Sequence, residues 1–303
     1  MKKKILHLNL YFGSLLLFCA FILVLVHISF VRRWFFIIAW WSFILIVDSL
    51  NFRRTKSSLL SKPLKDFLFV AYISVFVWLI FELFNLRLRN WSYFDLPSSL
   101  LERWAGYFLA FASVIPAMKE LSLFFEGILK KKFALFRIGV APALLKFLML
   151  AGAASIVLAL TFPRIFFPLT WLCFIFLLEP VNFWLKNQTL LRDLEKREWS
   201  RFGCWVLAGL VAGILWEFWN FLAKSHWEYS LPYLNFWRVF QMPLLGYTGF
   251  LPFGLEIFAI NELLLSLRER WQGKIILKGL AFIVLLFFYM VGFYLIDRYT
   301  LIP

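Results

Sequence analysis

The sequence predicts an all-α polytopic membrane protein with nine transmembrane helices. Hydrophobic residues make up 63% of the chain and charged residues only 16%, which leaves more apolar surface than one soluble core can bury. The apolar surface falls into runs of about 20 residues, the length that crosses a bilayer as a helix. No alternation of apolar and polar residues indicates strands.

The nine apolar runs are residues 11–31, 34–51, 67–86, 104–129, 138–162, 165–185, 202–222, 236–265 and 275–296. The eighth is long, so we expect it to be tilted, bent or broken. The first follows three lysines, yet it is long for a signal peptide and no clear cleavage site follows it, so we interpret it as a retained helix.

Basic residues gather on alternate loops. The clusters lie at residues 2–4, 53–65, 130–137, 186–201 and 268–278, and the loops between them hold fewer. This distribution predicts a cytoplasmic N-terminus and an external C-terminus in the plasma membrane. We therefore expect the net charge of +15 to meet anionic lipid headgroups, with no nucleic-acid partner.

One series of polar and aromatic residues occurs twice in the same order. The first copy is Glu82, Asn85, Trp91, Tyr93, Pro116, Glu120 and Glu126; the second is Glu217, Asn220, Trp227, Tyr229, Pro252, Glu256 and Glu262. Upstream of these, Trp40, Asp48, Asn51 and Phe52 correspond to Trp171, Glu179, Asn182 and Phe183. We expect an internal duplication, in which residues 1–137 and 138–272 are four-helix repeats and 273–303 add a C-terminal transmembrane helix. Because each repeat crosses the membrane an even number of times, the repeats have the same orientation.

Ionisable residues within the apolar runs are candidates for function, because a charge inside a bilayer is costly. Glu82 and Glu217 lie near the outer ends of the third and seventh runs. Each is followed by an asparagine and then by a base, Arg89 or Lys224, at spacings that share one helical face. The pattern fits a structural hydrogen-bond network or a functional site, and both interpretations stay open.

Glu120 and Glu256 lie deeper, each four residues after a proline that we expect to kink the helix. Desolvation favours a neutral carboxylic acid there, which is a proton donor. Glycine and proline crowd residues 241–254, whereas the fourth run has fewer. We therefore expect a broken eighth helix that lines a cavity, and the main site in the second half.

The remaining acids lie near the inner ends of the helices. Glu126 precedes Lys130 by one helical turn, which favours a boundary salt bridge. Asp48, Glu179 and Glu262 could stabilise helix ends or complete a proton path.

Aromatic residues make up 21% of the chain. An interfacial belt is the usual explanation for tryptophan and tyrosine outside spans, but their repeated spacing from an acid favours a pocket that stabilises a cation. The predicted catalytic residues are Glu256, Glu217 and Asn220, with a substrate pocket formed by Trp216, Trp227, Tyr229, Gln241 and Tyr247. The corresponding first-repeat positions are Glu82, Asn85, Trp91, Tyr93 and Glu120.

No cofactor or metal is expected. Cys19, Cys173 and Cys204 form no ligand-spaced cluster, and the three histidines are scattered. No phosphate-binding glycine motif and no aspartate-rich motif is present.

The order of acid, W-x-Y and proline-acid motifs resembles the lycopene cyclase domain of integral-membrane carotenoid cyclases. The motifs are WEFWNFLAKSHWEYSLP followed by LPFGLEIFAINE, and FELFNLRLRNWSYFDLP followed by IPAMKELSLFFE. The resemblance covers residues 81–126 and 216–262, about a third of the chain. That family has adjacent acids two and three residues after the proline, whereas single glutamates follow at four residues here. The resemblance implies cofactor-independent, proton-initiated cyclisation of an isoprenoid, with Glu217 and Glu256 at the family's acidic positions.

The leading hypothesis is thus an intramembrane acid-base enzyme, a cyclase or isomerase, that acts on an isoprenoid or other long apolar lipid. In it Glu256 donates a proton, and Glu217 with Asn220 orients the substrate or acts as the base. The alternatives are a proton- or cation-linked transporter or channel, and a lipid-binding scaffold without turnover. The sequence does not indicate an oligomeric state.

Overall fold

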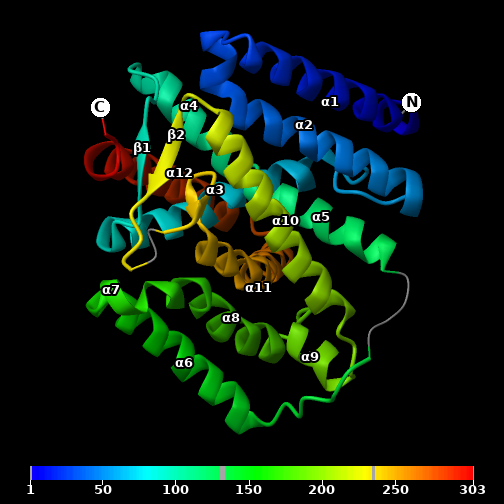
Figure 1. Ribbon diagram of the computed structural model, residues 1–303. Coiled ribbons are helices and arrows are strands. Elements are labelled where there is room, and N and C mark those ends of the chain that lie inside the picture. The colour runs from blue at the N-terminus through cyan, green and yellow to red at the C-terminus, as the bar shows by residue number, and fades with distance from the viewer. Residues whose placement is uncertain (1, 130–133, 234–235, 303) are drawn as a thin grey trace.

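The computed structural model describes residues 2–129, 134–233 and 236–302, and most of them are helical (Figure 1). Within these ranges, nine segments are long and apolar enough to cross a membrane. The predicted polytopic helical membrane protein is confirmed in this respect.

Six of the nine segments are unbroken helices. They are α1 (Lys2–Leu25), α2 (Ser29–Thr55), α3 (Leu64–Leu88), α6 (Pro142–Thr161), α10 (Ser200–Leu222) and α12 (Ile275–Tyr299). The other three are interrupted. They consist of α4 (Leu100–Phe111) with α5 (Val114–Ile128); of α7 (Pro163–Phe166), η1 (Phe167–Trp171) and α8 (Cys173–Trp184); and of η2 (Leu244–Gly249) with α11 (Phe250–Arg270). A short helix, α9 (Leu190–Glu195), precedes α10.

Two predicted boundaries are wrong. The first run was predicted to continue to residue 31, but α1 ends at Leu25 and the chain turns at His27, whose φ is 61°. The eighth run was predicted from Phe236, but residues 238–243 form two short paired strands, β3 (Arg238–Val239) and β4 (Met242–Pro243). The turn at His27 and the β3–β4 pair both contain many apolar and aromatic residues. Composition alone therefore does not separate them from the neighbouring helices.

The prolines of the two acidic motifs begin helices and do not bend them. Pro116 is the third residue of α5, and Pro252 is the third residue of α11. The first backbone N–H groups of a helix have no partner within it, so a proline there removes no hydrogen bond. The eighth segment is interrupted before Phe250, as predicted. The fourth and sixth segments are interrupted as well, so broken helices are not confined to the second half.

A two-stranded antiparallel ribbon joins loops that are far apart in sequence. Strand β1 (Trp91–Phe94) pairs with β2 (His226–Tyr229), with Trp91 opposite Tyr229 and Tyr93 opposite Trp227. The end of the chain extends this pairing, because the Tyr93 N–H donates to the Thr300 carbonyl oxygen at 2.8 Å. The expectation that the fold is purely helical is wrong here. Each strand has only four residues, too few for an alternating pattern to be recognised.

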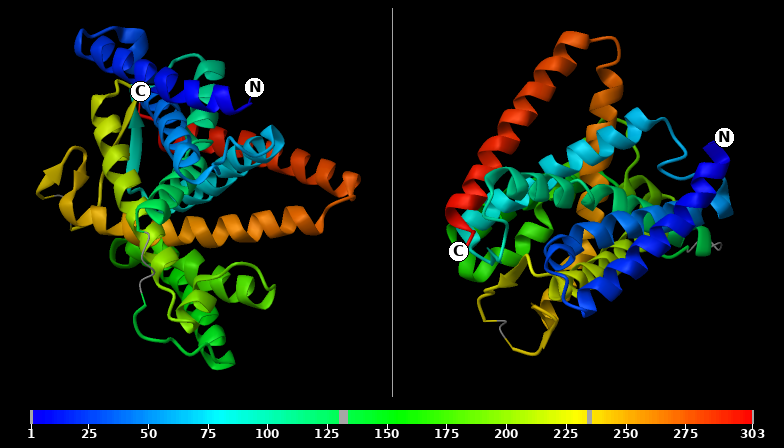
Figure 2. Two further views of the ribbon diagram at one scale, coloured as in Figure 1. Left: turned by 90° about the vertical axis from the view of Figure 1, so that its right-hand side faces the viewer. Right: turned by 90° about the horizontal axis from the view of Figure 1, so that it is seen from above.

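The helices divide into interior and peripheral ones. About half or more of the residues in the apolar windows of α2, α3 and α10 are buried, against fewer than a quarter in α1, α6 and α12. The peripheral helices expose large apolar side chains such as Phe12, Phe147 and Phe287. Figure 2 shows α12 running along an edge of the molecule. These exposed faces suit contact with lipid.

Two glycines bring α10 and α11 into backbone contact. A Cβ atom on Gly209 would lie 2.1 Å from the Phe250 carbonyl oxygen, and one on Gly254 would lie 2.1 Å from that of Trp205. Small residues permit such close approach between membrane helices.

We therefore expect Gly254→Ala to lower the thermal unfolding temperature of the detergent-solubilised protein, by overpacking worth about 1–3 kcal/mol. Gly203→Ala is the matched control, because nothing lies within 4 Å of a Cβ there. That change removes a helix-interior glycine and should be neutral or stabilising by about 1 kcal/mol. Equal stability of the two variants would contradict the assigned helix contact.

Candidate functional site

The carboxyl group of Glu82 is surrounded by aromatic hydrogen-bond donors. It accepts from the Trp78 indole at 2.8 Å, from the Trp91 indole at 3.2 Å and from the Tyr93 hydroxyl at 2.5 Å. The side chain is buried. The carboxyl group of Glu82 thus has its hydrogen bonds satisfied by side chains of the protein.

The carboxyl group of Glu217 has a sparser environment. Its Oε1 accepts from the Tyr229 hydroxyl at 2.7 Å, and its buried Oε2 has no hydrogen-bond partner among the described residues. A buried carboxyl oxygen without a donor is costly unless it carries a proton or meets a ligand. Glu82 and Glu217 therefore differ in the number of hydrogen-bond donors around the carboxyl group.

The asparagines tie the strands to their helices. Asn85 Nδ2 donates to the Trp91 carbonyl oxygen at 2.8 Å, and Asn220 Nδ2 donates to that of Trp227 at 2.8 Å. Each amide oxygen also accepts a strand N–H, from Trp91 at 3.2 Å and from Trp227 at 2.9 Å. Both ends of the Asn220 amide thus bind the strand backbone, which positions β2, and its catalytic part stays a prediction.

The predicted alignment of acid, amide and base on one helix face does not occur. Helix α3 ends at Leu88 and Arg89 takes a left-handed conformation, while α10 ends at Leu222, before Lys224. Helical spacing cannot apply beyond those ends. Within the described chain neither base forms an ion pair with Glu82 or Glu217.

A cavity of about 340 Å³ lies against the ribbon, between the two halves of the chain. Its aromatic wall comprises Trp78, Trp91, Tyr93, Tyr107, Phe111, Trp171, Trp216, Trp227, Tyr229 and Phe253. The Trp78 and Trp216 rings meet with centroids 4.8 Å apart. Helices far apart in sequence therefore build one chamber, predominantly from aromatic faces.

The cavity includes part of the predicted pocket and leaves part of it out. Trp216, Trp227 and Tyr229 of the predicted substrate pocket line it, and so do Trp91 and Tyr93, the corresponding first-repeat positions. Residues outside its wall are Glu82, Asn85, Glu120, Glu217, Asn220, Gln241, Tyr247 and Glu256. The Tyr247 hydroxyl donates instead to the Val239 carbonyl oxygen at 3.0 Å. Glu217 contacts the cavity wall through Tyr229, and Glu82 does so through Tyr93 and two tryptophan indoles.

The phenols of Tyr93 and Tyr229 connect the acids to the cavity. Burial, followed by the neighbouring carboxyl group, raises the pKa of both tyrosines well above the usual range. Both hydroxyls therefore keep their protons and act as donors.

Glu120 and Glu256, predicted as equivalent proton donors, have different partners. Glu256 Oε1 accepts the Phe174 N–H in the first turn of α8 at 2.9 Å, and Oε2 has no partner in the described chain. Glu120 accepts from Asn51 Nδ2 at 2.6 Å and from the Leu59 N–H at 2.7 Å. Both satisfy free backbone amides.

Two of the other acids also accept backbone N–H groups. Asp48 accepts the Leu60 N–H at 2.7 Å, and Glu179 accepts the Leu191 N–H at 3.0 Å. Glu262 accepts from the side chain of its neighbour Asn261 at 3.0 Å. The predicted Glu126 salt bridge involves Lys130, which lies outside the described residues.

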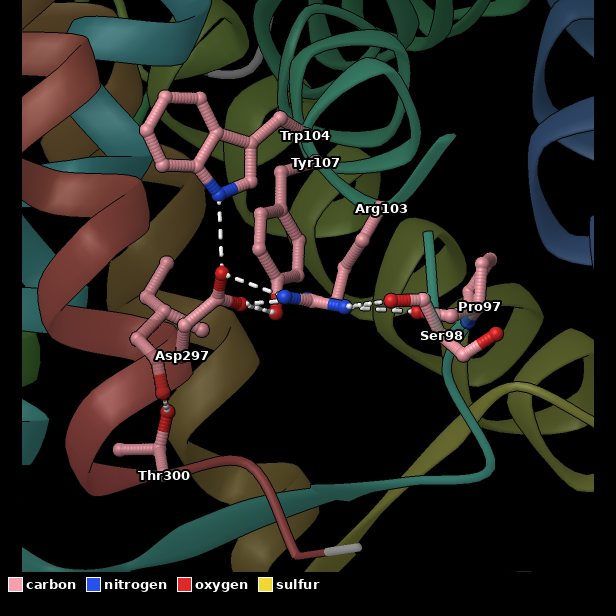
Figure 3. A network of polar contacts seen from close by, with 8 residues as sticks. Pro97, Ser98, Arg103, Trp104, Tyr107, Asp297 and Thr300 are labelled. Carbon is pink, nitrogen blue, oxygen red and sulfur yellow. Dashed lines mark hydrogen bonds and ion pairs between the residues drawn. The ribbon is translucent and has the colours of Figure 1, made fainter. Parts of the chain in front are cut away.

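Sequence reasoning missed a polar cluster at the cavity rim (Figure 3). Asp297 of α12 receives Arg103 Nε at 2.7 Å and Nη2 at 2.9 Å, together with the Trp104 indole and the Tyr107 hydroxyl at 2.9 Å each. Arg103 and Tyr107 also line the cavity. A single acid directly after the last apolar run, inside the same helix, was the available signal.

Metal binding finds no support in the part of the chain that the structure describes, where no group of three histidine, cysteine or acidic side chains is placed to hold an ion.

We expect Asp297→Ala to destabilise the protein strongly, because it leaves Arg103 and two aromatic donors without their acceptor. Breaking a largely buried ion pair costs about 3–5 kcal/mol, and these side chains are 13% and 14% exposed. The control is Asp66→Ala, which removes the more exposed pair with Arg268 and should cost at most about 1 kcal/mol. Thermal unfolding in detergent measures both, and an equal loss would refute a special part for the rim cluster.

Comparison with protein-family models, with curated proteins and with solved structures gives no match to this chain.

Proposed function

We propose that this protein binds a long apolar lipid of the isoprenoid class in the aromatic cavity and acts on it by acid-base chemistry. The observation that carries the proposal is the pair of Tyr229 and Glu217. The phenol lies on the cavity wall, and the carboxyl behind it holds one buried oxygen without a partner among the described residues. The resemblance to lycopene cyclase domains supports the same substrate class.

The proposed chemistry is a proton relay without redox change. In the reacting arrangement the Tyr229 O–H points to an alkene carbon, and Glu217 in its acid form donates to the phenol oxygen across the 2.7 Å contact, the reverse of the resting hydrogen bond. Both protons move in one step, so that Glu217 becomes the carboxylate and no phenolate forms. The resulting carbocation forms a new carbon–carbon bond or shifts its charge, stabilised by Trp216, Trp78 and Trp227. A proton then leaves an adjacent carbon by the same route. The product is an isomer of the substrate, so no co-reactant is required.

This assignment moves the donor from Glu256 to the Tyr229–Glu217 pair. Glu256 lies off the cavity wall and binds the first turn of α8, where an uncapped helix end needs an acceptor. Its proposed part is to hold the interrupted sixth segment against α11.

The duplication and the membrane topology belong to the same proposal. The pairing of β1 with β2 relates corresponding residues of the two halves symmetrically: Trp91 lies opposite Tyr229, and Tyr93 lies opposite Trp227. The matching bonds of Asn85 and Asn220 support two four-helix repeats of like orientation with one added helix. Basic loops at the end of the bundle away from the ribbon favour an internal N-terminus in a plasma membrane, with the cavity near the outer surface.

Transport of a proton or cation is the second candidate. Glu217 and Glu256 each keep a buried, unpartnered carboxyl oxygen within the described chain, and three of the nine segments are interrupted, as in many transporters. Proteoliposome flux that is lost in Glu217→Gln and Glu256→Gln, without lipid turnover, would favour this function. Stable lipid binding without either activity would leave a scaffold.

Deuterium transfer tests the acid-base proposal. We expect protein reconstituted with farnesol, a short isoprenoid alkene, in D₂O to place deuterium on carbon of the recovered lipid, as measured by mass spectrometry. Glu217→Gln and Tyr229→Phe should each slow this exchange about 100-fold or more, since a positioned acid-base group contributes about 10²–10⁴-fold.

Glu82→Gln and Tyr93→Phe are the matched controls, because they alter the corresponding pair at the opposite strand. They should leave exchange within about a factor of ten of the original protein. Unchanged exchange in folded Glu217→Gln protein would sink the relay. A selective loss in Glu256→Gln would return the donor to that residue.

A further inference from the structure

Two arginines, Arg33 and Arg103, lie on the cavity wall, and no acidic residue does. Arg103 is neutralised by Asp297, as described above. Arg33, near the start of α2, has no such partner: its buried Nε makes no hydrogen bond to any described residue. Among the described residues, the cavity therefore has an aromatic interior and an arginine whose buried Nε lacks an acceptor.

An unpaired guanidinium nitrogen that water does not reach is energetically unfavourable. Guanidinium groups bind oxyanions such as phosphate or carboxylate with paired, charge-assisted hydrogen bonds. The amide of Asn90, also on the wall, has a buried Oδ1 with no partner in the described chain. An anionic group beside Arg33 that also carries a hydroxyl proton would satisfy both residues.

The position of Arg33 agrees with a headgroup site. The carbonyl oxygen of Arg32, the preceding residue, accepts the Lys224 N–H at 2.8 Å. This turn of α2 therefore lies beside the loop that leads into β2. Arg33 thus lies at the ribbon end of the bundle. The Trp78–Trp216 contact lies within α3 and α10, farther from their ribbon ends.

We propose that the natural ligand is a single-chain amphiphile with an anionic head, whose head binds Arg33 and whose chain lies against the tryptophan faces of the cavity wall. A volume of about 340 Å³ is near the lower end of about 300–1,000 Å³ for ligand pockets, which suits one chain better than two. This inference rests on the proposed lipid site and specifies its ligand. Farnesyl monophosphate, oleate and farnesol are the probes, because the first two share an anionic head and the last is neutral.

Quenching of tryptophan fluorescence in detergent micelles measures the affinities. We expect the original protein to bind farnesyl monophosphate about 10- to 100-fold more tightly than farnesol, the range that a charge-assisted hydrogen bond provides. Arg33→Gln should abolish that preference and leave farnesol affinity unchanged, and Arg33→Lys should restore part of it. Arg32→Gln, which removes a neighbouring charge that does not line the cavity, should keep the full preference.

The outcomes separate this inference from the proposed function. Equal binding of farnesol and the phosphate by the original protein, or a preference that survives Arg33→Gln, overturns the anionic head while the lipid cavity stands. Binding of none of the three probes overturns both. A preference for oleate over the phosphate identifies a carboxylate head. Normal binding without deuterium transfer leaves the anionic ligand in place and refutes only the chemistry.

Discussion

Two buried carboxyl groups, Glu82 and Glu217, need hydrogen-bond donors in a region that excludes water, and the site follows from that requirement. The nearest donors are the tyrosines of two strands beyond the helix ends. Asn85 and Asn220 fold these strands back by binding their backbone. Once folded back, the strands pair with each other, and their aromatic side chains close one side of the cavity.

The ribbon is short and depends on its surroundings. A two-stranded ribbon is marginal on its own, but here the end of the chain pairs with Tyr93, and α12 is fixed by four hydrogen bonds to Asp297. Helix α12 is therefore part of the site, although it lies outside the repeated pattern. Its contribution is to hold Arg103 and Tyr107 at the cavity rim.

Local sequence patterns predicted the spans and the polar residues of the site, but not their partners. Hydropathy is a property of one segment, so nine apolar runs were predictable, as was the importance of Glu82 and Glu217. The strand pairing depends on residues from opposite halves, which no local pattern contains. Proline was misinterpreted for a related reason, since Pro116 lies at a helix start that only the three-dimensional structure reveals. The contact of Glu256 with the Phe174 N–H also joins segments far apart in sequence, so no local pattern indicates it.

The difference between the two acids has a specific origin one helical turn before each of them. Four residues before Glu82 stands Trp78, whose indole donates to the carboxyl. Four residues before Glu217 stands Gly213, where a Cβ would lie 2.2 Å from the ring of Phe250. In the second half the phenyl ring of Phe250 therefore occupies the place that an indole takes in the first half. A phenyl ring has no hydrogen-bond donor. Glu217 is left with an oxygen that the described protein does not satisfy, behind a tyrosine that faces the cavity. A motif that occurs twice in the sequence thus has two different environments: a fully bonded carboxyl group in one half and, in the other, the acid of the proposed relay.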